Sequence, residues 1–157
     1  MTSKIANLIA IVQLTLSASA YAEEAQKYIG MVNPAIPKDC KVTGDGIVTG
    51  EGTATIGFKR LWCETASVFW LQQRVHETQQ QWRVIDVLSI PRHEKYGVLM
   101  GGEDECTYAT EPNSWVIAYG DYGHIISAWA MPINPNEKKF RSIPADKVTC
   151  VFVDHSN

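Results

Sequence analysis

Residues Trp82–Ile90 read Trp-Arg-Val-Ile-Asp-Val-Leu-Ser-Ile and are followed by Pro91. β-Branched and aromatic residues dominate this stretch, which is typical of a strand. A proline has no backbone N–H and cannot continue the ladder inside a sheet. The segment therefore predicts a strand that ends at Pro91.

Segments of similar composition lie on both sides and are separated by glycine-rich turns. We expect strands at Thr53–Trp62, Trp115–Tyr119, His124–Met131 and Lys147–Val153, with smaller apolar runs at Ile47–Thr49 and Tyr96–Met100. The turn signals are Gly44-Asp45-Gly46, Gly50-Glu51-Gly52, Gly120-Asp121-Tyr122-Gly123 and Asn134–Glu137. The third of these predicts a hairpin, because a Gly-Asp-x-Gly turn joins two β-forming runs.

The stretch Ala66–His76 fits two structures. Its apolar residues match either the alternation of a strand or one face of a helix, and periodicity alone does not separate the two. We favour a strand, because aromatic residues are frequent and the polar tract Glu77–Gln81 suits a hairpin loop. The chain is thus predicted to be mainly β, with α+β possible. We expect one antiparallel-sheet or small sandwich domain.

The composition is that of a folded globular domain. Of the 157 residues 45% are hydrophobic and 20% are charged, which excludes wholesale disorder, collagen and coiled coil. The length allows one domain. The formal net charge of −3 offers no basic face for nucleic acid.

The first 22 residues have the three parts of a secretory signal peptide. A positively charged start is followed by the apolar run Ile5–Leu16 and by small residues that end in Ala20-Tyr21-Ala22. The apolar run is too short for a transmembrane helix, which needs about 20 apolar residues. We therefore expect residues 1–22 to be cleaved and residues 23–157 to form a single domain, periplasmic or secreted from a bacterium.

Four cysteines remain after this cleavage, at Cys40, Cys63, Cys106 and Cys150. An even number of cysteines in an exported chain indicates disulfides, and three pairings are possible. We favour Cys40–Cys63 with Cys106–Cys150, since each bond then closes a loop within its own half. Structural zinc sites bring their ligands in close pairs, which these scattered cysteines do not form. No cofactor is indicated.

A resemblance covers roughly the second half of the chain. The pattern consists of Trp82–Leu88 with Pro91, then Cys106, then Ala128-Trp129 and finally Val148-Thr149-Cys150. It is similar to a pattern in small exported proteobacterial proteins to which no activity is attached. The resemblance implies a secreted domain with a Cys106–Cys150 bond. It implies no catalytic residue.

Two groups of carboxylates are candidates for function. Asp86 lies in mid-strand: Val84 and Leu88 share its parity, while Ile85 and Val87 oppose it. A buried carboxyl group there would be a candidate acid for catalysis, but such groups usually pair with arginine or accept backbone N–H bonds. The acidic segment Glu103–Glu105, with Glu111 and Asp121 further on, lacks the spacing of a calcium loop. We predict that Glu103, Asp104 and Glu105 form an acidic loop, anchored by Cys106, that binds a basic partner.

Other catalytic patterns are missing. No Gly-x-Ser-x-Gly or phosphate-binding glycine loop occurs, and oxidised cysteines would not act as nucleophiles. We interpret the five tryptophans chiefly as core residues. The sequence therefore favours an exported binding protein, for example an inhibitor or immunity protein that caps an envelope-acting toxin or hydrolase. The alternatives are a small envelope-polymer hydrolase and a structural envelope component.

Overall fold

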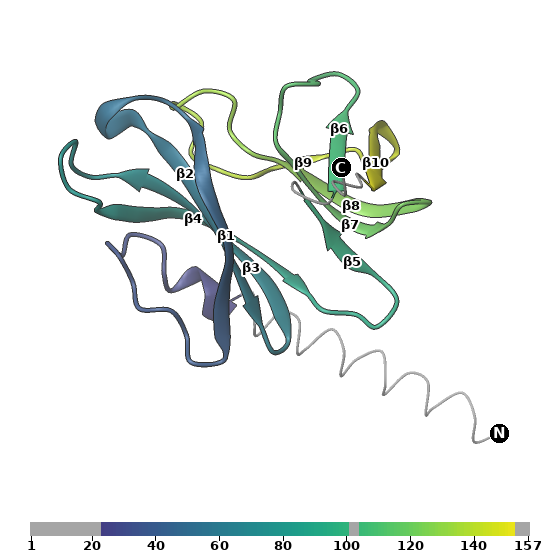
Figure 1. Cartoon of the computed structure of the whole chain (residues 1–157), viewed down its shortest axis with the longest axis horizontal. Helices are drawn as coiled ribbons and strands as arrows, with labels where there is room; N and C mark the ends of the chain where they lie inside the picture. The colour runs from purple at the N-terminus through teal and green to yellow at the C-terminus, as the bar shows by residue number, and fades with distance from the viewer. Residues whose placement is uncertain (1–22, 101–103, 153–157) are drawn as a thin grey trace, which may run out of the picture.

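A computed structural model describes residues 23–100 and 104–152 (Figure 1). Within these residues the chain is mainly β, and only residues 23–26 and two short 3-10 segments are helical. The strands are β1 (Cys40–Thr49), β2 (Ile56–Cys63), β3 (Ala66–Arg74), β4 (Trp82–Pro91), β5 (Gly97–Leu99), β6 (Asp104–Tyr108), β7 (Val116–Asp121), β8 (His124–Ala130), β9 (Arg141–Ile143) and β10 (Val148–Phe152), and the 3-10 helices are η1 (Gly52–Ala54) and η2 (Ala145–Lys147).

All strand pairs are antiparallel, as predicted, and they form three sheets. The N-terminal sheet has the order β1-β2-β3-β4, and the C-terminal sheet has the order β5-β7-β8-β9. Strands β6 and β10 pair only with each other, and we call this pair the ribbon. Among the described residues, no helix has the length and apolar character needed to cross a membrane.

Both predicted disulfides are present. Cys40 is bonded to Cys63, and Cys106 to Cys150. Each pair occupies directly opposite positions of two antiparallel strands, β1 with β2 and β6 with β10. Directly opposite residues bring their side chains close enough for such a bond. The N-terminal sheet and the ribbon are therefore each closed by one disulfide.

The molecule is built in layers (Figure 1). The segment from residue 23 to 39 covers one face of the N-terminal sheet, and the C-terminal sheet packs on the other face. The ribbon then covers the far face of the C-terminal sheet. The cluster between the two sheets, which we call the inter-sheet core, is centred on Phe58, Phe69, Ile90, Met100, Ile117 and Met131.

Strand β3 lies in the middle of this stack, which explains its ambiguous sequence. Val68 and Trp70 pack under the N-terminal segment, whereas Phe69 belongs to the inter-sheet core. Because both faces of β3 are buried, its apolar residues do not alternate with polar ones. The strand predicted for Ala66–His76 is confirmed, and it ends at Arg74.

One predicted turn is wrong. Gly44-Asp45-Gly46 lies inside β1, which runs for ten residues and bulges after Val42. Gly46 serves packing instead, because a Cβ atom there would lie 3.2 Å from the ring of Phe58 on the adjacent strand. The second signal does form a turn, in which Gly50 and Gly52 have positive φ angles of 87° and 55°.

Candidate interaction surface

The predicted acidic loop is in part a strand. Glu103 lies outside the described residues, whereas Asp104 and Glu105 begin β6, opposite Phe152 and Val151 of β10. The ladder that places Cys106 opposite Cys150 continues for two more residue pairs, so Asp104 and Glu105 both belong to the ribbon. The side chain of Glu105 is exposed. Binding by this segment stays a prediction.

Asp86 has a structural contact. Its Oδ2 accepts a hydrogen bond of 2.7 Å from the backbone N–H of Phe140, just before β9. The parity expected from the sequence holds for Leu88 but is wrong for Val84, because a register shift leaves Ile85 as an extra residue between Val84 and Asp86. Val84 consequently packs under the N-terminal segment, while Leu88 packs in the inter-sheet core. Asp86 therefore joins the two sheets.

A cluster near the first disulfide resembles a metal site only by distance. The side-chain ligand atoms of Asp39, Cys40 and Cys63 lie within 4.8 Å of one another. Both sulfur atoms belong to the disulfide, however, so neither is a thiolate that could bind a metal. This cluster is not a metal centre.

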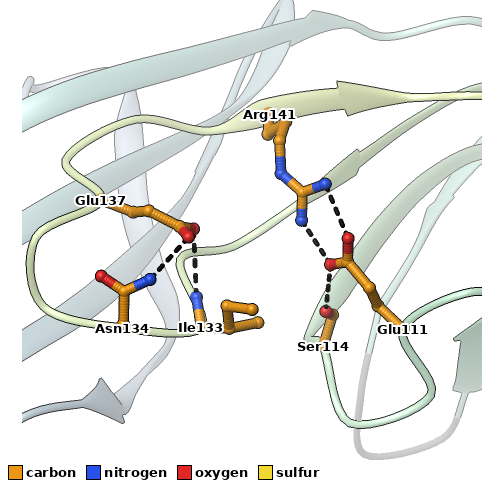
Figure 2. A network of polar contacts seen from close by, with 6 residues as sticks. All are labelled: Glu111, Ser114, Ile133, Asn134, Glu137 and Arg141. Atoms are coloured by element: carbon orange, nitrogen blue, oxygen red, sulfur yellow. Dashed lines mark hydrogen bonds and ion pairs between the residues drawn. The ribbon is translucent and has the colours of Figure 1, made fainter.

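A pair of charged residues braces the loop before β7 (Figure 2). Arg141 at the start of β9 donates two hydrogen bonds to the carboxylate of Glu111: Nη1 to Oε1 at 2.9 Å, and Nη2 to Oε2. The hydroxyl of Ser114 donates to the same Oε2 at 3.0 Å. The hydrogen bond from Arg141, with a further contribution from Ser114, lowers the pKa of Glu111.

A second network fixes the loop between β8 and β9 (Figure 2). Glu137 accepts a hydrogen bond of 2.7 Å from the amide of Asn134 and one of 3.4 Å from the backbone N–H of Ile133. Asn134 in turn accepts the N–H of Asn136 at 3.0 Å. The turn predicted at Asn134–Glu137 is thus present, and its own side chains hold it.

Two large apolar side chains are exposed on these two loops. Trp115 is 46% exposed and Ile133 is 52% exposed. They line one hollow of about 380 Å³, together with Val48, Pro112 and Pro132. We call this region the Trp115–Ile133 surface. It spans both halves of the molecule, because the ring of Trp115 lies 5.8 Å from that of Phe58 in β2.

The loop that contains Ile133 also carries two lysines. Lys138 and Lys139 are exposed on the loop that contains Ile133, whereas the charge of Arg141 is matched by Glu111. The surface can therefore offer apolar anchors, a hollow and two lysines to a binding partner.

Sequence reasoning missed this surface. Interpreting the tryptophans as core residues is correct for Trp70, which is fully buried, but wrong for Trp115. Trp115 sits directly before β7, after the turn-forming Pro112-Asn113-Ser114, so its position at a strand end was a usable signal. The contact of Glu111 with Arg141 joins residues 30 positions apart, and no local pattern reveals it.

Comparisons with models of known protein families, with curated proteins and with solved structures find no match. The resemblance to small exported proteobacterial proteins accordingly stays a prediction.

Proposed function

We propose that this chain is a binding protein that docks a partner protein on the Trp115–Ile133 surface. One observation carries the proposal: an exposed tryptophan and an exposed isoleucine flank one hollow, on two loops that each have their own hydrogen-bond network. Tryptophan is among the residues that most often dominate binding energy in protein interfaces. Loops that are ordered before binding lose less entropy when the partner arrives.

The charges support an acidic site on the partner. Lys138 and Lys139 are exposed on the loop that contains Ile133, and opposite charges across an interface steer association. This is a different surface from the acidic segment Glu103–Glu105, which would favour a basic partner. Both fit a binding function, and each is testable by itself.

The class of partner follows from the proposed location. The N-terminal sequence favours export, and two disulfides suit an oxidising compartment such as the periplasm. A small, braced domain that binds a protein there would act as an inhibitor or immunity protein, capping a toxin or hydrolase of the envelope. Removal of the signal peptide after Ala22 is part of this proposal.

The alternative is a small hydrolase of envelope polymers. Glycosidases need two carboxyl groups that face each other across the substrate. Asp86 and Glu111 instead contact a backbone N–H and Arg141 respectively. Turnover of a cell-wall polymer that Asp86→Asn abolishes would favour the hydrolase and overturn the binding proposal.

The test is affinity capture from periplasmic extract, followed by affinity measurement with the captured partner. Trp115→Ala and Ile133→Ala should each weaken binding, and the tryptophan change by about thirtyfold, as for a central interface tryptophan. Ile126→Ala is the matched control, because Ile126 is 43% exposed but lies on β8, away from the hollow. The control should bind as the wild type does.

Full affinity in both Trp115→Ala and Ile133→Ala would remove this surface from the interface. If the triple change of Glu103, Asp104 and Glu105 to alanine slows association in their place, the acidic segment is the binding site.

A further inference from the structure

A groove lies on the opposite side of the N-terminal sheet, away from the C-terminal sheet. It has a volume of about 610 Å³ and is bounded by the chain segment 33–36 and by residues from all four strands of the sheet. Its size is within the range of about 300–1,000 Å³ that is usual for small-molecule sites. The proposed docking surface does not use it.

The floor of the groove contains a glycine that the Trp82 ring approaches closely. Gly57 of β2 has no side chain, and a Cβ atom there would lie 2.8 Å from the carbonyl oxygen of Gly46 and 3.2 Å from the ring of Trp82. The Trp82 ring is further held by the Arg74 guanidinium, 5.1 Å from the ring centre. The Trp82 ring therefore lies close to the Gly57 backbone and forms the aromatic part of the groove lining.

The chain segment 33–36 is fastened to the sheet next to Trp82. Asn33, which adopts a positive φ of 45°, accepts the backbone N–H of Trp82 on its side-chain oxygen at 2.9 Å and donates its amide to the Gln80 carbonyl at 3.3 Å. Its own backbone N–H donates to the Trp82 carbonyl at 2.9 Å. The groove is thus formed before any ligand enters.

Gln72 supplies the observation that points to a ligand. This residue lines the groove and is only 5% exposed, and no hydrogen bond joins its side-chain amide to another described residue, while the amide atoms are not fully enclosed and so open to the groove. An amide that no neighbouring residue satisfies is left to bind water or a ligand in the groove. An amide offers a donor and an acceptor side by side, which matches two neighbouring hydroxyl groups.

The charges of the lining are balanced. Asp45 of β1 and Lys59 of β2 are directly opposite each other in the ladder, and both line the groove. A ligand with net charge of either sign would meet one like charge, whereas a neutral ligand with many hydroxyl groups can accept from the ammonium and donate to the carboxylate. Trp82 adds an apolar surface for the C–H face of such a ligand.

We propose that this groove binds a neutral saccharide, with Gln72, Asp45 and Lys59 hydrogen-bonding its hydroxyl groups beside Trp82. The site is separate from the Trp115–Ile133 surface, so the protein would bind an envelope glycan and a partner protein on different faces.

The test titrates the full mature chain with three neutral probes, cellohexaose, maltohexaose and chitohexaose. Affinity is measured by calorimetry, and the side-chain amide signal of Gln72 is followed by NMR. At least one probe should bind and shift that signal. Gln72→Met, which keeps the side-chain length without the amide, should weaken binding about tenfold or more, the effect of losing one or two hydrogen bonds. Asp45→Asn should weaken it less.

Stability separates this role from a structural one. Gln72→Met removes an amide that bonds to no other described residue and places an apolar side chain at a position that is only 5% exposed, so its unfolding temperature should equal or exceed that of the wild type. A Gln72 that served only the fold would show the reverse, a lower unfolding temperature with unchanged binding. Trp115→Ala should bind the saccharide normally, and Gln72→Met should capture the protein partner normally, so that each proposal can fail alone.

Three results would overturn the saccharide site. They are the absence of binding by all three probes at millimolar concentration, equal binding by the wild type and Gln72→Met, and tighter binding of penta-alanine with acetylated and amidated ends, an uncharged peptide, than of any saccharide.

Discussion

The two halves of the molecule order their strands by different means. In the N-terminal sheet every strand pairs with its neighbour in sequence, and the order is β1-β2-β3-β4. In the C-terminal half, β6 leaves the sheet between β5 and β7 and pairs with β10 at the far end of the chain. The first disulfide therefore spans 23 residues, whereas the second spans 44.

This difference concerns how each half is held together. A four-stranded meander closes its sheet with short turns and would retain most of its contacts without a disulfide. An isolated two-stranded ribbon is at best marginally stable, so the ribbon depends on its packing against the C-terminal sheet and on the Cys106–Cys150 bond. We expect the C-terminal half to be more sensitive to loss of its disulfide.

Removing the disulfides should have the largest effect. By loop-closure entropy alone, the bonds contribute about 3.4 kcal/mol for Cys40–Cys63 and about 4.0 kcal/mol for Cys106–Cys150. Cys106→Ser with Cys150→Ser should therefore lower the free energy of unfolding more than Cys40→Ser with Cys63→Ser does, as measured by urea unfolding. In Cys106→Ser with Cys150→Ser, the amide hydrogens of β6 and β10 should also exchange before those of β2 and β3. The comparison fails if Cys40→Ser with Cys63→Ser lowers the free energy of unfolding more than Cys106→Ser with Cys150→Ser.

Removing the hydrogen bond between the two sheets should lower the stability by an intermediate amount. Asp86→Ala leaves the N–H of Phe140 without its acceptor, which should cost about 1 kcal/mol. Asp86→Asn keeps an acceptor oxygen and is the matched control. Hydrogen exchange of the Phe140 amide should accelerate in the alanine variant and change little in the asparagine variant. Equal protection in all three proteins would mean that Asp86 does not join the halves.

The smallest effect should come from Glu111, whose ion pair is exposed to solvent. Its folded-state pKa lies below the usual value because Arg141 donates to the carboxylate. The stabilisation is therefore present above the unfolded pKa of about 4.3 and is lost as the pH falls through the lower folded value. Unfolding temperatures of the wild type and Glu111→Gln should differ at pH 7 and converge toward pH 3. A difference that persists at low pH would contradict this.

Local patterns predicted the hairpins well. Asp121 pairs with His124 across the expected Gly-Asp-x-Gly turn, and the polar tract after β3 leads back from Arg74 to Trp82. Both outcomes follow because turn chemistry and strand alternation act over a few residues. The positions that local patterns misassigned are those where a distant segment intervenes. Gly46 lies inside a strand and packs against Phe58, and a bulge at Ile85 turns Val84 to the opposite face from Asp86.

The candidate sites were largely beyond local reasoning. The Trp115–Ile133 surface joins two loops on either side of β7 and β8, and it depends on the contact between Glu111 and Arg141. The groove combines Asn33 with side chains from four strands. No single stretch of the chain contains either arrangement.

The sequence by itself determined that the chain is mainly β and where most of its hairpins turn, and it favoured the correct one of three cysteine pairings, because these depend on composition, short-range backbone preferences and loop length. Only the tertiary structure decided which tryptophan is exposed and which glutamine lines a groove. The reason is physical: whether a side chain meets solvent depends on which layer covers its face of the sheet. That layer comes from segments tens of residues away.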